Sequence, residues 1–268
     1  MHRTRLGSIM DFAYTVAGFA VGAIVGLTGV GGGSLMTPLL VLMFGIHPSV
    51  AVGTDLLYAA ITKAGGTLAH GLKGTVDWTV TRRLASGSIP AAVLTLLFIG
   101  HFAPGGIDGA TGIIKVALGI ALVLTAVAII FRKRIQEYAL VRFGENPDPR
   151  RTAILTVLTG AVLGVLVSIS SVGAGALGVT ALFFLYPRLP TLRIVGSDIA
   201  HAVPLTAVAG MGHWMLGSVD WLLLGSLIIG SLPGIWLGSH ISTKVPDRVL
   251  RPILATMLML VGAKLITH

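Results

Sequence analysis

Long apolar runs recur along the whole chain, separated by short stretches that hold most of the polar residues. Several runs approach the ~20 apolar residues that a helix needs to cross a bilayer. A transmembrane β-barrel would instead alternate apolar and polar residues in segments of about ten. The pattern therefore predicts an all-α integral membrane protein, a polytopic helical bundle. The apolar segments lie at 10–29, 34–46, 50–72, 78–100, 110–131, 152–186, 194–216, 219–241 and 249–267.

Composition and charge agree with this class. Of the 268 residues, 54% are hydrophobic and only 11% are charged, against about a quarter charged in a soluble domain. The formal net charge of +9 does not indicate a nucleic-acid partner, because the basic residues of membrane proteins gather in cytoplasmic loops. The chain has no cysteine, which excludes thiolate metal sites and iron–sulfur clusters. We expect a multi-pass protein of the cell (inner or plasma) membrane, in contact with membrane lipids and without a cofactor or metal.

The chain contains two related halves. The segment "GTDLLYAA" at Gly53 matches "GSDIAHAV" at Gly196, and "HGLKGTVDW" at His70 matches "HWMLGSVDW" at His213. Both pairs are 143 residues apart, and 13 of the 38 positions from Gly53 to Pro90 are identical in the second half. Coincidence among small residues would not place His, Asp, Trp and Pro at a constant spacing. Duplications of this kind underlie many transporter folds.

The expected organisation is a first transmembrane repeat at 1–131, a basic cytoplasmic linker at 132–151 and a second transmembrane repeat at 152–268. The linker holds six Lys or Arg residues and the Pro-rich "NPDPR", and such basic segments stay in the cytoplasm. A homo-oligomer of the whole chain is possible, and the sequence leaves this open.

The distribution of basic residues predicts that the two repeats are inverted. Lys73, Arg82 and Arg83 flank the first "VDW" loop, whereas no basic residue flanks the second, so the two loops belong on opposite faces of the membrane. Inversion needs an odd number of crossings in each half. The first, broken unit of each half would then enter and return as a re-entrant hairpin. A first unit that crosses fully is the alternative, and Arg3 and Arg5 favour it.

Each half opens with a glycine-rich break in its apolar region. "TGVGGGS" at Thr28 matches "SSVGAGA" at Ser170, 142 residues on. Backbone that leaves the helix inside a membrane is tolerated only where protein or a water-filled cavity satisfies its amides, and glycine permits the turns. We expect a broken helix, with Ser34 or Thr37 capping the helix that follows and Pro38 in its first turn. The separate pattern of Gly18, Gly22 and Gly26 is more typical of close helix packing.

Two helix N-termini that converge on these breaks would form a site for a small anion, since their N–H groups and helix dipoles favour negative charge. Discontinuous helices serve this purpose in other transporters. The cation Lys63 lies in the middle of a span without a counterpart in the second half; it could contact the anion or only neutralise Asp55. The predicted substrate-binding residues are Gly29, Gly31, Gly32, Gly33, Ser34, Ser170, Ser171, Gly173, Gly175 and Lys63.

Ionisable residues within spans are functional candidates, because burying them is costly unless they are paired or hydrated. Asp55 and Asp198 occupy equivalent positions of the two repeats, and His201 follows Asp198 by one helical turn. We assign proton or ion coupling to these three residues, with the Asp198–His201 pair able to relay protons. Helix capping is the competing interpretation of both aspartates. Asp77 and Asp220, each followed by Trp, are expected to be interfacial caps.

The glycine-rich break after an N-terminal span, the "PLL" at Pro38, and the "GTD" at Gly53 with its repeat "GSD" at Gly196 resemble the TauE/SafE sulfite exporter family over nearly the whole chain. The glycine motif and the duplicated halves are fairly specific to this family, whereas the substrate is not. The resemblance implies export of sulfite, sulfoacetate or related sulfur-containing anions. The second break, from Ser171 to Gly175, departs from a full "GxGGG", so the resemblance does not imply equal roles for the two breaks.

The leading hypothesis is a secondary transporter that exports small anions, sulfur-containing ones such as sulfite or organosulfonates, by alternating access. An anion channel is the alternative, with the same broken segments lining a continuous pore. An intramembrane enzyme is a third class: Ser34, Ser171 and several histidines are available, but neither "GxSxG" nor "HExxH" occurs. We therefore expect a protein that is not an enzyme.

Overall fold

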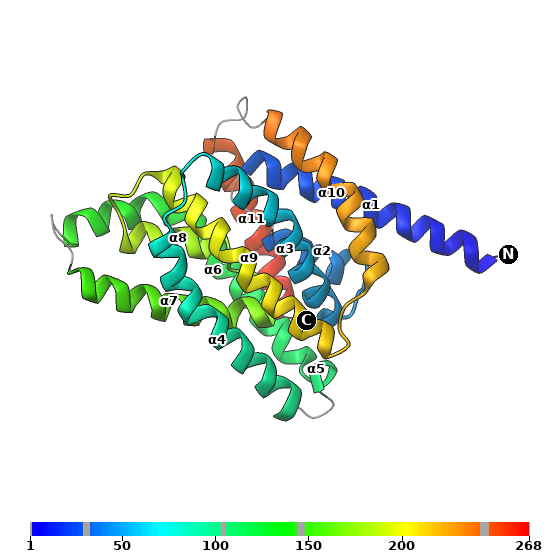
Figure 1. Ribbon diagram of the computed structural model, residues 1–268. Coiled ribbons are helices and arrows are strands. Elements are labelled where there is room, and N and C mark those ends of the chain that lie inside the picture. The colour runs from blue at the N-terminus through cyan, green and yellow to red at the C-terminus, as the bar shows by residue number, and fades with distance from the viewer. Residues whose placement is uncertain (1, 29–32, 103–105, 144–147, 242–246, 268) are drawn as a thin grey trace.

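The computed structural model describes residues 2–28, 33–102, 106–143, 148–241 and 247–267 (Figure 1). Every element within these ranges is an α-helix, as the apolar runs predict. The helices are α1 (His2–Thr28), α2 (Gly33–Met43), α3 (Pro48–Leu72), α4 (Trp78–Phe102), α5 (Gly106–Gly109), α6 (Thr111–Phe143), α7 (Pro149–Ser170), α8 (Ala176–Leu185), α9 (Thr191–Met215), α10 (Trp221–Ile241) and α11 (Asp247–Thr267).

Five of the described helices are long and apolar enough to cross a membrane: α4, α6, α7, α9 and α10. The predicted class, an all-α membrane protein, is therefore confirmed. The helix α6 continues past the apolar run that ends at Phe131 and reaches Phe143, so the first part of the predicted linker is helical. The short helix α5 had no signal in the apolar pattern.

Polar and apolar side chains are distributed as expected for a protein surrounded by lipid. Large apolar side chains such as Phe98, Trp236 and Ile253 are exposed on the outside of the bundle, whereas polar ones such as Ser88 and Ser197 are fully buried. Within a membrane, polar and ionisable groups face the interior of the bundle, where they find partners. The residues that could carry function thus lie inside the bundle.

The broken unit of each half is a helical hairpin. In the second half, the Oη atom of Tyr186, just after α8, lies 2.8 Å from Oγ1 of Thr156 near the start of α7. In the first half, the ring of Phe44, just after α2, lies 5.0 Å from the ring of Tyr14 on α1. Each short helix therefore folds back along the long helix before it, and the re-entrant path of these units through the membrane stays a prediction.

Each long helix of these hairpins packs against a helix of the other half, α1 against α10 and α7 against α4. Glycine makes both contacts close: a Cβ atom at any of four glycines would collide with the backbone of the facing helix. The pairs are Gly18 with Leu227, Gly22 with Ser231, Gly160 with Leu84, and Gly164 with Ser88. The packing role predicted for Gly18 and Gly22 is confirmed.

The central pair, α3 and α9, lies side by side in the middle of the bundle (Figure 1). The loop that follows α3 reaches the start of α9, where the backbone N–H of Asp77 donates to Oγ of Ser197 at 2.8 Å. The loop that follows α9 reaches the start of α3, where the N–H of Asp220 donates to Oγ1 of Thr54 at 3.1 Å. The two helices are therefore antiparallel. The loop of each half contacts the central helix of the other half at an equivalent position.

The two "VDW" aspartates are helix caps, as predicted. Oδ1 of Asp77 accepts hydrogen bonds from the backbone N–H groups of Thr79 and Val80 at the start of α4. Oδ1 of Asp220 does the same at the start of α10. Side-chain oxygens at this position satisfy the unpaired donors of the first turn.

Candidate functional site

The break of the second half is a non-helical segment between α7 and α8. Ser171 adopts the left-handed conformation with φ 58°, and Gly173 and Gly175 have φ of 123° and 140°. A side chain would strain the backbone at the two glycines, so glycine is needed at both. The prediction of a broken helix at this segment is confirmed.

The break of the first half is described only at its edges. The helix α1 ends at Thr28 and α2 begins at Gly33. Gly29, Gly31 and Gly32 lie outside the described residues, as does the side chain of Ser34.

Two predictions about the helix after the first break are wrong. Because α2 begins at Gly33, Pro38 lies inside the helix and not in its first turn. Thr37 is also inside α2, and its hydroxyl and N–H donate to Asp55 on the neighbouring helix α3 and do not cap α2.

Helix capping is likewise wrong for Asp55 and Asp198. The helix α3 begins at Pro48 and α9 begins at Thr191, so both aspartates lie about two turns inside a helix, where they cannot act as N-caps. The prolines at 48 and 190 set these earlier starts, since proline is well tolerated at the beginning of a helix. Both carboxyl groups therefore need another explanation.

Asp55 joins the two halves of the protein. Its side chain is fully buried, and Oδ2 accepts hydrogen bonds from Oγ1 of Thr37 at 2.5 Å, from the N–H of Thr37 at 3.2 Å and from Oγ of Ser171 at 3.0 Å. Thr37 belongs to the helix after the first break, and Ser171 opens the second break. One carboxylate oxygen thus connects the predicted anion-binding segments, and Oδ1 has no hydrogen-bond partner among the described residues.

Asp198, the repeat counterpart of Asp55, has a different environment. Its side chain is 1% exposed, and neither carboxyl oxygen has a hydrogen-bond partner among the described residues. The carboxyl group lies against Gly178 in the first turn of α8, where a Cβ atom would collide with Oδ1. Glycine at 178 therefore makes the space that the carboxyl group of Asp198 fills.

Lys63 interacts with both aspartates and reaches the second break. Its side chain is 8% exposed, and Nζ donates a hydrogen bond to the carbonyl oxygen of Ala174 at 2.6 Å. The ammonium group also interacts electrostatically with Asp198 and Asp55. One buried cation is therefore shared by two buried carboxyl groups beside an interrupted helix.

His201 is fully buried on α9, one helical turn after Asp198. One ring nitrogen, Nε2, lies 2.8 Å from Oγ of Ser88 on α4, and the other, Nδ1, is buried with no partner among the described residues. His201 and Asp198 share a face of α9, as their spacing predicts, but no hydrogen bond joins them within the described part. The proton relay assigned to this pair stays a prediction.

The structure adds three residues to this site that the sequence did not single out, Ser88, Ala174 and Gly178, and it gives Thr37 a role at Asp55 in place of the predicted cap. For Ser88 and Thr37 the sequence showed only a Ser or Thr within an apolar run, which is common in membrane helices that bond their own backbone. Their roles come from which helix faces which.

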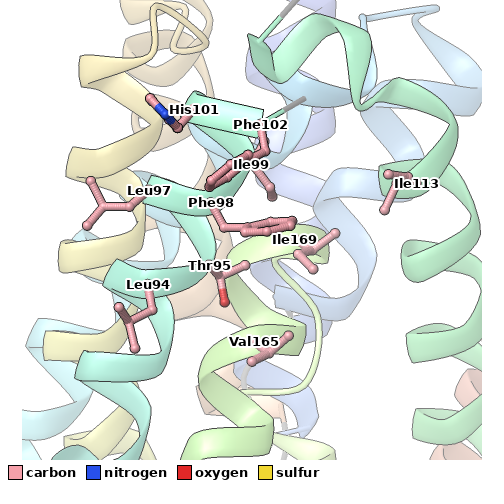
Figure 2. Close-up of a pocket in the computed structure, with 10 residues that line it drawn as sticks. All are labelled: Leu94, Thr95, Leu97, Phe98, Ile99, His101, Phe102, Ile113, Val165 and Ile169. Atoms are coloured by element: carbon pink, nitrogen blue, oxygen red, sulfur yellow. The ribbon is translucent and has the colours of Figure 1, made fainter. Parts of the chain in front are cut away.

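A separate apolar groove of about 840 Å³ lies between α4, α6 and α7. In Figure 2 the side chains of Leu94 and Phe98 from α4, Ile113 from α6, and Val165 and Ile169 from α7 line it. None of the buried ionisable residues contributes to its lining. The groove therefore does not have the chemistry of an anion site.

Known proteins similar to this chain are named as probable membrane transporters. The family model described as sulfite exporter TauE/SafE matches residues 14–265. The probable membrane transporter protein YjnA of Bacillus subtilis (strain 168) is 40% identical over 257 residues, which cover 96% of this chain and all of the relative. A probable membrane transporter protein of Xylella fastidiosa (strain 9a5c) is 28% identical over 230 residues, 85% of this chain and 83% of the relative. No solved structure matches the chain.

Proposed function

Because this chain belongs to the sulfite exporter TauE/SafE family of membrane transporters, we propose that it is a secondary transporter of small anions in the cell membrane. The substrate is sulfur-containing, such as sulfite or an organosulfonate, and export proceeds by alternating access. This assignment makes the protein a carrier and not an enzyme. A membrane potential that is negative inside favours export by about 2.3 kcal/mol at 100 mV for each net negative charge that leaves in the transported complex.

The observation that carries the proposal is the buried cation at the second break. Lys63 donates to the carbonyl oxygen of Ala174, which lies in the non-helical segment directly before α8. The N-terminus of α8 presents the positive end of its helix dipole at the same place. An anion held here would meet a positive charge and backbone amides together, a combination suited to the several acceptor oxygens of a sulfur oxyanion.

Alternating access is supported by the relation between the two halves. The central helices α3 and α9 are antiparallel, and each half forms the same contacts with the other at equivalent positions. If α3 and α9 both cross the membrane, an antiparallel pair of equivalent helices makes the repeats inverted. In transporters with inverted repeats, the halves exchange conformations around a fixed site and so open it to one side and then to the other.

Flux measurements in proteoliposomes test the proposal. We expect saturable uptake and counterflow with at least one of sulfite, thiosulfate and sulfoacetate. A conductance that does not saturate would favour a channel, and no flux of any of the three anions would refute the assignment.

A glycine variant tests the location of the site. Gly175→Ala places a side chain at φ 140°, which we expect to introduce about 1–3 kcal/mol of strain in the break and to slow transport about tenfold. Gly225→Ala is the matched control, because a Cβ atom there meets nothing within 4 Å, and its transport should equal that of the wild type. Equal transport by both variants would place the anion elsewhere.

A further inference from the structure

We propose that the transporter binds its anion together with one proton, and that Asp198 accepts this proton when the anion takes over the charge of Lys63. The inference rests on the proposed function, since it concerns the same site. It assigns the coupled ion and the residue that carries it.

The first argument is the charge of the buried site. Lys63, Asp55 and Asp198 are 8%, 0% and 1% exposed, and in their charged forms they sum to one negative charge. The transported anion would meet net repulsion from these three residues, because charges interact far more strongly in a low-dielectric interior than in water. Uptake of one proton by a carboxylate removes this repulsion.

Few other ionisable groups lie near Asp198 and could balance the charge of the incoming anion. From α3, Lys63 and Asp55 act on this part of the site, and His201 lies on α9 itself. His70 and Asp77 lie next to Gly196 and Ser197 at the start of α9. The other helices packed on this part of α9 contribute Ser88 from α4 and Gly178 from α8, and α8 contains no ionisable residue.

The second argument identifies which carboxyl group takes the proton. Oδ2 of Asp55 accepts three hydrogen bonds from Thr37 and Ser171, and such donors stabilise a charged carboxylate. The oxygens of Asp198 receive no hydrogen bond from the described residues, and the stabilising interaction of its charged form is the electrostatic one with Lys63. When an anion engages Lys63, Asp198 loses this interaction and its charge becomes the least supported in the site.

His201 is a poorer proton acceptor in this state. Protonation of Asp198 removes a buried charge, whereas protonation of the fully buried ring of His201 would create one. Nε2 of His201 is already engaged with Ser88. The proton therefore belongs on Asp198, and the anion and the proton, bound in the same state, move in the same direction.

Calorimetry on the purified full-length protein in detergent tests this coupling, with thiosulfate as the probe because it does not titrate near neutral pH. Titrations in buffers of different ionisation enthalpy give the number of protons taken up per anion, expected to be about one at alkaline pH. The dissociation constant should rise between pH 7 and pH 9, approaching about tenfold per pH unit, as linkage of one proton requires.

Variants assign the proton. In Asp198→Asn we expect binding that does not vary with pH and no proton uptake. Asp198→Glu, which keeps a carboxyl group at this position, should keep the pH dependence. Anion binding by the wild type without proton uptake would overturn the coupling but not the proposed anion site. This measurement does not depend on the folding of a variant. An unchanged slope in Asp198→Asn would overturn the assignment to Asp198. If thiosulfate, sulfite and sulfoacetate all fail to bind, the proposed function falls and this inference with it.

Discussion

Replacing Lys63 with methionine removes the buried positive charge and keeps a side chain of similar length. The carbonyl oxygen of Ala174 loses the donor that now lies 2.6 Å away, and Asp198 and Asp55 lose the cation that interacts with both. Removing one partner of a buried charged pair destabilises a protein by about 3–5 kcal/mol. A carboxyl group here can take up a proton in response, so we expect a loss at the lower end, about 3 kcal/mol.

The loss can be measured as a shift of the melting temperature. One kcal/mol corresponds to roughly 2–4 °C for a chain of this size, so Lys63→Met should melt about 6–12 °C below the wild type. The assay is thermal unfolding in detergent followed by the fluorescence of the four tryptophans, since the chain has no cysteine for thiol-reactive dyes. Lys264→Met is the control, because this lysine is exposed near the end of α11, and it should melt within about 1 °C of the wild type.

A double variant separates charge from packing. In Lys63→Met/Asp198→Asn the carboxyl group that lost its counter-charge is gone, so more than half of the lost stability should return. Non-additivity of this kind is expected for residues that interact directly. A melting temperature of Lys63→Met within 2 °C of the wild type would refute the role of the buried charge. So would a double variant whose melting temperature lies below that of the wild type by the sum of the two single losses.

Two further predictions concern packing and topology. Gly164→Val should melt roughly 2–12 °C below the wild type, because its Cβ would collide with the backbone of Ser88 and overpacking costs about 1–3 kcal/mol. Gly65→Ala, with open space around it, should not melt lower than the wild type, and equal melting temperatures of the two variants would contradict this. Leu72→Cys and Met215→Cys, both exposed at equivalent helix ends, should react with an impermeant thiol reagent from opposite sides of the membrane; labelling from one side would refute inversion.

Apolar runs and glycines determined most of what could be predicted about the helices. The predicted segments at 50–72 and 78–100 agree with α3 and α4 to within two residues, because lipid-facing and buried turns are both apolar. The run that ends at Phe131 missed the end of α6 at Phe143, because a helix that leaves the membrane continues with polar residues. Hydropathy marks where a helix is in lipid and not where its hydrogen bonds stop.

The ionisable residues of the candidate site could be named from the sequence, whereas their contacts could not. Unpaired charges in apolar spans identified Asp55, Asp198 and Lys63. That Thr37 donates to Asp55, and that Lys63 reaches the break of the other half, depends on how two distant segments dock. The unequal surroundings of the two aspartates also arise there, since equivalent sequence positions meet different neighbours.

The exchanged contacts of the central loops have a consequence for how the protein is made. The N–H of Asp77 donates to Ser197, and the N–H of Asp220 donates to Thr54. The loop after each central helix therefore needs a hydrogen-bond acceptor from the other half. Equivalent positions are 143 residues apart, and at about 5–20 residues per second a ribosome needs roughly 7–30 s to supply the missing half. During that interval the newborn first half sits in the membrane with the glycine surface of α1 uncovered. The first half must therefore stay intact in the membrane until the second half has been synthesised. If the two halves are synthesised as separate polypeptides, they should accumulate only when they are made together.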